Sequence, residues 1–332
     1  MASRAVTAWL LAWSIFTGSS AARGEESPSG EPSTGHNELI AMPTMGGKQF
    51  WADEYYFRGW RIQCNVVTGH YRLLDPSNQR HTWGTFDECR AKLDEIRRRD
   101  NLAPMKGRAV VVLHGLMRSR KSMARLCAYL EEKGGFTVVN VSYPTTRRSI
   151  GEHAKSLARL IDSLEGIEEI NFVGHSMGNI VVRHYLGDRI DPATGRPRDG
   201  RFRRMVMLAP PNHGSRLAAA LADNGAFVLI DGRAGQELGA DWDKIKDRLA
   251  VPPFAFGVIA GGRGDDKGFN PLLPGDDDGT ISVATTHLPG EADFLLVPVL
   301  HSFIMNDPRV MESTLRFIQT GRFDEPDATT EP

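Results

Sequence analysis

The stretch that decides the fold of this chain reads Asn171-Phe172-Val173-Gly174-His175-Ser176-Met177-Gly178-Asn179-Ile180-Val181-Val182. The mostly apolar run at 170–173 is typical of the end of a buried strand, and large residues recur at helical spacing after Gly178. A strand, a sharp turn and a helix around Gly-x-Ser-x-Gly are the context in which this pattern indicates a reactive serine. Ser176 is then expected at a strained backbone position, where Gly174 and Gly178 let strand and helix pass closely. The alternative is a glycine-rich turn that contains a serine by chance, and the flanking strand and helix pattern disfavours it.

The composition is that of an ordinary globular protein. The chain has 332 residues, a hydrophobic content of 41% and a formal net charge of −1. This length suits one large α/β domain with extensions, or two domains. The near-neutral charge favours neither nucleic acid nor another polyanion as a partner, so we expect no nucleic-acid binding.

Three cysteines, Cys64, Cys89 and Cys127, lack the spacing of a zinc site, and we expect no metal. Cys64 and Cys89 flank a segment with the pattern of a hairpin followed by a helix. Two alternatives therefore remain open: the two cysteines form a disulfide, or both are free thiols. Cys127 lies in a helical apolar stripe and is expected to be buried.

Residues 1–22 have the features of a signal peptide. Arg4 precedes an apolar stretch at 5–16, and small residues follow at 18–22, so cleavage is expected after Ala22. A membrane anchor is the alternative, but the apolar run is short for a bilayer span. We therefore expect an exported protein, secreted or periplasmic. Residues 23–46 are rich in Gly, Ser, Pro, Thr and Glu and predict a flexible linker.

Residues 47–100 predict a small unit of a β-hairpin and a helix. Alternating residues at 60–66 and a returning strand at 71–74 form the hairpin, with a further strand at 81–83. Thr85 caps the helix that follows, and the apolar residues of this helix recur on one face. The many aromatic side chains suit either a ligand surface or burial against the main domain, and we favour burial.

From residue 101 to residue 321 apolar strands alternate with helices. The strands are expected at 109–113, 137–141, 170–173, 202–208, 254–260 and 294–300, and the main helices at 122–133, 150–164, 179–187 and 308–318. This alternation predicts an α/β fold in which helices flank a mostly parallel sheet. Residues 217–250 contain short helices and glycines, and both a mobile lid and a rigid connection fit them. Residues 322–332 predict a disordered acidic tail.

A serine hydroxyl is a poor nucleophile at neutral pH and needs a histidine base that an acid orients. Around a Gly-x-Ser-x-Gly turn, acid and base follow the serine in that order, each on a loop after a strand. The histidines beyond Ser176 are His184, His213, His287 and His301. The first lies two turns along the helix, the second follows the wrong strand and the third precedes the last strand. His301 directly follows the last buried strand and is the predicted base.

Three consecutive aspartates, Asp276, Asp277 and Asp278, compete for the role of the acid. At most one of them meets His301, because successive side chains point apart. Asp278 precedes Gly279 and an expected short strand, which suits an acid held on a turn. Asp278 is the predicted acid, and Asp277 is second. The remaining aspartates are expected to face solvent or to hold a cation, although adjacent carboxylates lack the spaced ligands of a calcium loop.

The negative charge that develops on an attacked carbonyl oxygen needs hydrogen-bond donors. One predicted donor is the backbone N–H of Met177, immediately after Ser176. The other is the N–H of Leu116, in the turn that follows the first parallel strand. His114 is expected to pack this turn.

The motifs Leu113-His114-Gly115-Leu116, Gly174-His175-Ser176-Met177-Gly178, Asp278-Gly279 and Leu300-His301 together resemble those of the α/β-hydrolase superfamily. They are most similar to its bacterial lipase and esterase branch, and the run at 208–215 resembles a loop that many such lipases carry. The resemblance covers about 108–318 and does not extend to 50–99.

This resemblance implies an α/β-hydrolase fold and the hydrolysis of carboxylic esters through an acyl-serine intermediate, without a metal or organic cofactor. It also implies an ester or lipid substrate, with a lipid interface as a further partner, and it leaves the oligomeric state open. The same superfamily contains acyltransferases and amidases, so these activities remain alternatives. A catalytically silent module that binds a partner is a third alternative, which the complete set of motifs disfavours.

Overall fold

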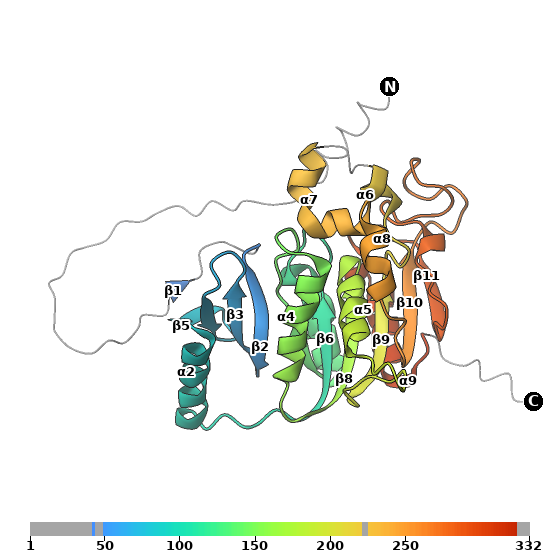
Figure 1. Ribbon diagram of the computed structural model, residues 1–332. Helices are drawn as coiled ribbons and strands as arrows, with labels where there is room; N and C mark the ends of the chain where they lie inside the picture. The colour runs from blue at the N-terminus through green and yellow to red at the C-terminus, as the bar shows by residue number, and fades with distance from the viewer. Residues whose placement is uncertain (1–41, 44–48, 221–224, 324–332) are drawn as a thin grey trace, which may run out of the picture. The chain divides into compact units, whose positions relative to one another are not determined.

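The computed structural model describes residues 42–43, 49–220 and 225–323 of the chain (Figure 1). The predicted signal peptide, most of the predicted linker and the predicted tail from residue 324 lie outside the described residues. None of the described helices is long and apolar enough to cross a membrane.

A parallel sheet forms the centre of the α/β part. Its strands are β6 (Gly107–Leu113), β7 (Thr137–Asn140), β8 (Ile167–His175), β9 (Phe202–Leu208), β10 (Ala255–Gly261) and β11 (Asp293–Val297). They lie in the order β11-β10-β9-β8-β6-β7, and every neighbouring pair is parallel. The predicted α/β class with a mostly parallel sheet is confirmed.

Helices cover both faces of this sheet, as the alternation along β6 requires. Ala109, Val111 and Leu113 belong to one apolar core, shared with α4 (Ile150–Asp162) and α5 (Met177–Arg189). These two helices lie on one face of the sheet (Figure 1). Val110 and Val112 belong to the other core, shared with α3 (Ala124–Gly134) and α9 (Pro308–Thr320). The short 3-10 helix η1 (Arg120–Met123) precedes α3.

Local signals set the ends of these helices. Ser149 and Glu152 form a reciprocal capping box at the start of α4. Asp307 caps α9 by accepting a bond from Arg309 N, with Pro308 in the first turn, and Gly321 ends α9 in the left-handed conformation.

The residues before the parallel sheet form a second, antiparallel sheet, which we call the small sheet. Its strands are β1 (Met42–Pro43), β2 (Trp51–Phe57), β3 (Trp60–Asn65), β4 (Tyr71–Leu74) and β5 (Gln79–Gly84), in the order β1-β5-β4-β3-β2. Helix α2 (Phe86–Arg99) follows, with Thr85 and Glu88 as its capping box. The apolar side chains of the small sheet and α2 join the core that contains α4 and α5.

Strand β2 has no counterpart among the strands expected from the sequence. Its alternation is broken by a bulge between Asp53 and Tyr55, and it buries the charged side chains of Asp53 and Glu54. Both features hide the strand from a hydropathy pattern. The cysteines Cys64, Cys89 and Cys127 are all free, so the disulfide considered between the first two is not formed.

In the described part of the chain between β9 and β10 lie four helical segments: α6 (Arg216–Ala220), α7 (Gly225–Leu238), α8 (Trp242–Ile245) and η2 (Lys246–Arg248). A kink at Gly232 interrupts α7, where the φ angle is 64°. A Cβ atom at Gly232 would lie 1.9 Å from Thr146 O, so α7 passes directly over the segment after β7.

Two expectations near the predicted acid and base are corrected. The strand expected after Asp278 is a single bridge between Asp277 and Ser282, followed by the 3-10 helix η3 (Val283–Thr285). The last strand ends at Val297 instead of residue 300, because Pro298 has no N–H to continue the ladder. A 3-10 helix, η4 (Ile304–Asn306), leads into α9.

Candidate active site

Ser176 lies between β8 and α5 in a strained conformation, with φ 52° and ψ −124°. The two flanking glycines are required by close backbone contacts. A Cβ atom at Gly174 would lie 2.3 Å from Asn179 Oδ1, and one at Gly178 would lie 2.7 Å from Leu113 O. The stretch 174–178 is therefore a tight strand-to-helix elbow that presents the serine.

Asn179 holds this elbow together and was not identified from the sequence. Its Nδ2 donates to Ser176 O at 3.1 Å and to Leu208 O at 3.2 Å. Ser176 N also donates to Leu208 O, at 2.9 Å. The amide of Asn179 thus ties the elbow to the end of β9. The only signal in the sequence is a polar residue inside an otherwise apolar helix start.

The structure brings the three predicted catalytic side chains together. Ser176 Oγ lies 3.0 Å from His301 Nε2, and His301 Nδ1 lies 2.7 Å from Asp278 Oδ2. All three residues are buried. Asp278 O also accepts a bond from His301 N at 2.8 Å, so the acid binds both the side chain and the main chain of the histidine.

The turn after β10 fixes the orientation of Asp278. Its other carboxylate oxygen, Oδ1, accepts bonds from Thr280 N at 3.0 Å and Ile281 N at 2.7 Å. The carboxylate therefore has one oxygen bound to the turn and one directed at the imidazole.

The two neighbouring aspartates support the same loop through bonds from backbone N–H groups. Asp277 is 0% exposed and accepts bonds from Gly279 N at 2.6 Å and Asn270 N at 3.0 Å. Its burial raises its pKa, against the opposing effect of these backbone donors. Asp276 accepts bonds from Arg263 N at 2.7 Å and Gly264 N at 2.8 Å. The expectation that Asp277 faces solvent was wrong, because its carboxylate is buried and satisfied by backbone amides, whereas Asp276 is half-buried.

The other downstream histidines bind elsewhere. His184 Nδ1 lies 3.3 Å from Asp188 Oδ2. His213 Nε2 bonds to His287 O at 3.1 Å, and His287 Nδ1 bonds to Glu291 Oε1 at 2.6 Å. Within the described residues, His301 is the histidine that bonds to Ser176.

Leu116 and Met177, the predicted oxyanion donors, lie on the two segments that meet at the serine. Met177 is the first residue of α5, where backbone N–H groups have no acceptor within the helix. A Cβ atom at Gly115 would lie 3.0 Å from Ser176 Cβ, so the turn before Leu116 touches the serine directly. Strands β6 and β8 are neighbours at the point where the strand order reverses, which is where parallel sheets bind ligands.

Two buried histidines surround this centre. His114 stacks on Tyr143 with ring centroids 4.4 Å apart, and burial lowers its pKa to about 4. His175 bonds through Nε2 to His301 O at 3.1 Å. Burial, and then the nearby His301, lower the pKa of His175 well below its usual value. Both imidazoles are therefore neutral near pH 7 and act through hydrogen bonds and packing. Sequence analysis did not assign a role to His175.

The arrangement is suited to activating a hydroxyl. Because Asp278 accepts the bond from His301 Nδ1–H, the Nε2 atom is left as the acceptor for the Ser176 proton. The helix N-terminus of α5 and the adjacent turn supply a region that favours developing negative charge.

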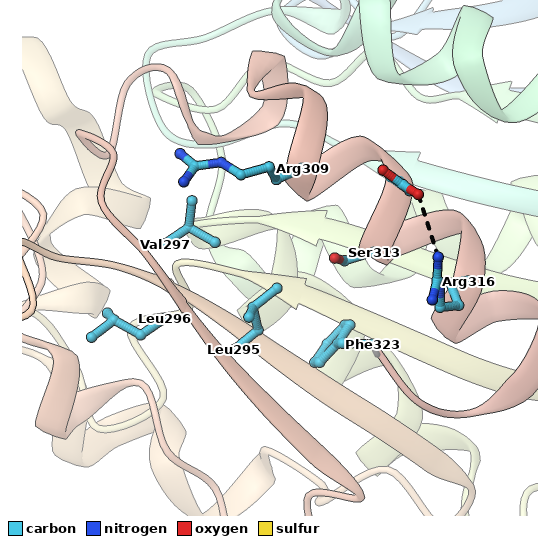
Figure 2. A pocket seen from close by; sticks show the side chains of 8 residues that line it. Leu295, Leu296, Val297, Arg309, Ser313, Arg316 and Phe323 are labelled. Atoms are coloured by element: carbon cyan, nitrogen blue, oxygen red, sulfur yellow. Dashed lines mark hydrogen bonds and ion pairs between the residues drawn. The ribbon is translucent and has the colours of Figure 1, made fainter. Parts of the chain in front are cut away.

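Two pockets lie away from this centre. One, of about 330 Å³, lies between β11 and α9, where Arg309, Ser313 and Arg316 face Leu295 and Val297 across a shallow groove (Figure 2). The other, of about 220 Å³, lies between the small sheet and α4. Neither is lined by Ser176, Asp278 or His301. In the described part of the chain, no cluster of three or more His, Cys, Asp or Glu side chains is suited to hold a metal ion.

Comparison with known proteins identifies the fold. No protein-family model matches the chain, and no curated protein matches its sequence. The chain is similar to the mature form of the lipase BlEst2 from Bacillus licheniformis, with 20% identity and a TM-score of 0.50 over 64% of this chain and 91% of that one. It is also similar to the propeptide form of that lipase, with 21% identity and a TM-score of 0.50 over 69% of this chain and 54% of that one. These likenesses show that the chain has the α/β-hydrolase fold.

Proposed function

We propose that this protein is an exported serine ester hydrolase of the lipase or carboxylesterase type. The observation that carries the proposal is the chain of hydrogen bonds from Ser176 through His301 to Asp278, at 3.0 and 2.7 Å, built on a strand-to-helix elbow. Fold likeness alone would not support an activity, since this fold hosts many reactions. Export rests on the signal-peptide pattern of residues 1–22.

In the proposed reaction Ser176 Oγ attacks the ester carbonyl carbon while its proton moves to His301 Nε2. The leaving alcohol takes this proton as the C–O bond breaks, and the acyl group remains on the serine. Water then attacks the acyl-serine with His301 as the base, which releases the acid and restores the hydroxyl. Asp278 keeps the imidazole in the correct tautomer and stabilises its charged form.

The backbone N–H groups of Leu116 and Met177 are the proposed donors to the carbonyl oxygen. This oxygen carries negative charge only after attack, so donors directed at it lower the barrier without tightening ground-state binding. This assignment is supported by two observations: the turn after β6 contacts Ser176 at Gly115, and Met177 is the first residue of α5.

An apolar rim supports a substrate with an apolar acyl part or a lipid surface. We call these five exposed side chains the rim: Met117, Phe269, Leu272, Leu300 and Phe303. They are between 38% and 65% exposed, and all lie on loops after β6, β10 and β11, the same edge of the sheet as the serine. Exposed apolar side chains gathered at one edge favour contact with apolar ligands.

The test of the proposed activity is hydrolysis of a p-nitrophenyl ester by the wild type, Ser176→Ala and Ser313→Ala. Ser313 lies on α9 in the groove of Figure 2 and serves as the matched control. We expect Ser176→Ala to lose hydrolysis with an unchanged melting temperature, and Ser313→Ala to retain it. A fluorophosphonate probe should modify Ser176 in the wild type. Full activity of Ser176→Ala, or an unmodified and inactive wild type, would overturn the proposal, and the latter would favour a silent binding module.

The substrate class is tested by the acyl chain length of the ester. Phe303→Ser should reduce the rate on a long-chain ester more than the rate on the acetate, because only the long chain reaches the rim. Trp83→Ser, at a residue that is 63% exposed on the small sheet, is the control and should change neither rate. Equal effects of Phe303→Ser on both esters would argue against an acyl contact at the rim.

A further inference from the structure

The turn that carries Leu116, here residues 114–118 and called the oxyanion turn, is held by the segment after β7. We call residues 142–146 the support segment. Tyr143 Oη donates to His114 O, and Met117 N donates to Thr145 Oγ1 at 3.0 Å. Thr145 is fully buried. Tyr143 and Thr145, two positions apart on the support segment, thus bind the oxyanion turn on either side of Leu116.

The small sheet binds the support segment from its other side. Asp53 N donates to Ser142 O at 2.8 Å, and Ser142 N donates to Asp53 Oδ2 at 2.7 Å. The remaining carboxylate oxygen of Asp53 accepts a bond from Gln63 Nε2 at 2.6 Å. Asp53 is buried, and a buried carboxylate is tolerated only where donors satisfy it. This pair therefore fixes the start of the support segment to β2.

Gln49, which precedes β2, extends the connection to the oxyanion turn itself. Its Oε1 accepts bonds from Thr145 Oγ1 at 3.3 Å, Thr146 Oγ1 at 3.3 Å and Thr146 N at 3.4 Å. Its Nε2 donates to Arg118 O at 3.5 Å. Three donors bond to Gln49 Oε1, and the carbonyl of Arg118 accepts from Gln49 Nε2. These partners fix which side of the amide carries the oxygen.

These contacts form a relay from the small sheet to the turn. Met117 N–H donates to the hydroxyl of Thr145, and that hydroxyl donates in turn to Gln49 Oε1. Because a hydroxyl has one proton, its bond to Gln49 leaves its lone pairs directed at Met117 N. The amide of Gln49 thereby sets the direction of the bond that holds the residue after Leu116.

We propose that the small sheet serves the reaction by holding the oxyanion turn, with Gln49 and Asp53 as positioning residues. The inference rests on the proposed ester hydrolysis and gives a role to residues 49–99. A purely structural role for these contacts would change stability alone. A positioning role changes the rate of the chemical step, since oxyanion donors act on the transition state.

The test compares Gln49→Ala with the matched control Gln79→Ala, which removes an exposed glutamine from β5 of the small sheet. We expect Gln49→Ala to lower kcat about 10-fold, less than the loss of a whole donor, with KM unchanged. Gln79→Ala should leave both constants unchanged. Melting temperatures of the two variants should agree within a few degrees, so that the effect on kcat is separate from stability.

Two further variants distinguish positioning from packing. Gln49→Glu keeps the acceptor for Thr145 and Thr146 but loses the donor to Arg118 O, so it should restore part of kcat. Thr145→Val removes the relay hydroxyl and should lower kcat at least as much as Gln49→Ala. The double variant Gln49→Ala/Thr145→Val should be no slower than Thr145→Val, because both changes act through one relay. An additive double variant would overturn the relay.

The outcomes separate this inference from the proposed function. If the wild type neither hydrolyses the ester nor reacts with a fluorophosphonate at Ser176, the proposed function fails. If the wild type is active and Gln49→Ala has the kcat of Gln79→Ala, the role of the small sheet is overturned while the proposed function stands.

Discussion

His175 Nε2 donates a hydrogen bond to His301 O at 3.1 Å, so the residue before the predicted nucleophile holds the main chain of the predicted base. His301 N donates to Asp278 O at 2.8 Å on the other side. The His301 backbone is therefore fixed from both directions, independently of its side-chain bonds. Burial keeps His175 neutral, and because the carbonyl oxygen of His301 can only accept, the single ring proton of His175 lies on Nε2 for this bond.

His175→Phe should lower kcat on a p-nitrophenyl ester about 10-fold with little change in KM, because the ring volume stays and the donor is lost. His175→Gln supplies a side-chain N–H and should recover part of kcat. The control is His184→Phe, a buried histidine on α5 next to Asp188, which should keep the wild-type rate. Equal losses in His175→Phe and His175→Gln would indicate a packing role instead of the bond.

Asp278→Asn should lower kcat about 10³–10⁴-fold while the protein stays folded, because an amide cannot stabilise the charged imidazole and favours the wrong tautomer. Asp277→Asn should act mainly on stability, since the amide N–H₂ would meet the backbone donors Gly279 N and Asn270 N. We expect its free energy of unfolding to fall by about 1–3 kcal/mol. Steady-state kinetics measure kcat, and urea unfolding measures the free energy of unfolding, for both Asp278→Asn and Asp277→Asn. A larger kinetic loss in Asp277→Asn would reverse the assignment of the acid.

The parts of this site that could be predicted from sequence depend on short patterns and chain order. The elbow at 174–178 is a local motif, and His301 and Asp278 follow it in the order that the fold requires. The mostly parallel sheet with flanking helices followed from alternating apolar strands and helices.

The parts that could not be predicted depend on contacts between distant segments. Gln49 lies far from Thr145 in the sequence, and no periodicity connects them. Strand β2 was hidden because it buries Asp53, whose partners come from β3 and the support segment. The burial of Asp277 follows from a loop conformation that three adjacent carboxylates do not reveal.

Gly178→Ala should destabilise the elbow and lower kcat. Its Cβ would lie 2.7 Å from Leu113 O and 3.0 Å from His114 O, and backbone atoms at the start of the oxyanion turn cannot yield without moving Leu116. We expect a loss of about 1–3 kcal/mol in the free energy of unfolding, as for overpacking elsewhere. Gly200→Ala is the matched control, because a Cβ there meets nothing within 4 Å. Its stability should change by less than about 0.5 kcal/mol. Equal behaviour of the two variants would show that the elbow has room for a side chain.

The buried side chain of His153 should make the free energy of unfolding fall at acid pH. Burial lowers its pKa from 6.5 to about 3 in the folded protein, so the unfolded chain binds a proton below pH 6.5 that the folded protein does not bind. His153 therefore makes its whole contribution to the free energy of unfolding above pH 6.5. This contribution is lost progressively as the pH falls from 6.5 toward 3.

His153→Phe keeps a ring against Tyr143, whose centroid lies 5.0 Å away, and removes this titration. Between pH 6 and pH 4.5 the wild type should lose stability faster than His153→Phe, by up to about 1.4 kcal/mol per pH unit, the value for one proton. Glu152, whose pKa is lowered from 4.5 to about 2, affects the slope near pH 4.5 in both proteins, so the difference between their slopes reports His153. Urea unfolding at four pH values measures both slopes. Parallel slopes would mean that His153 is protonated in the folded protein despite its burial.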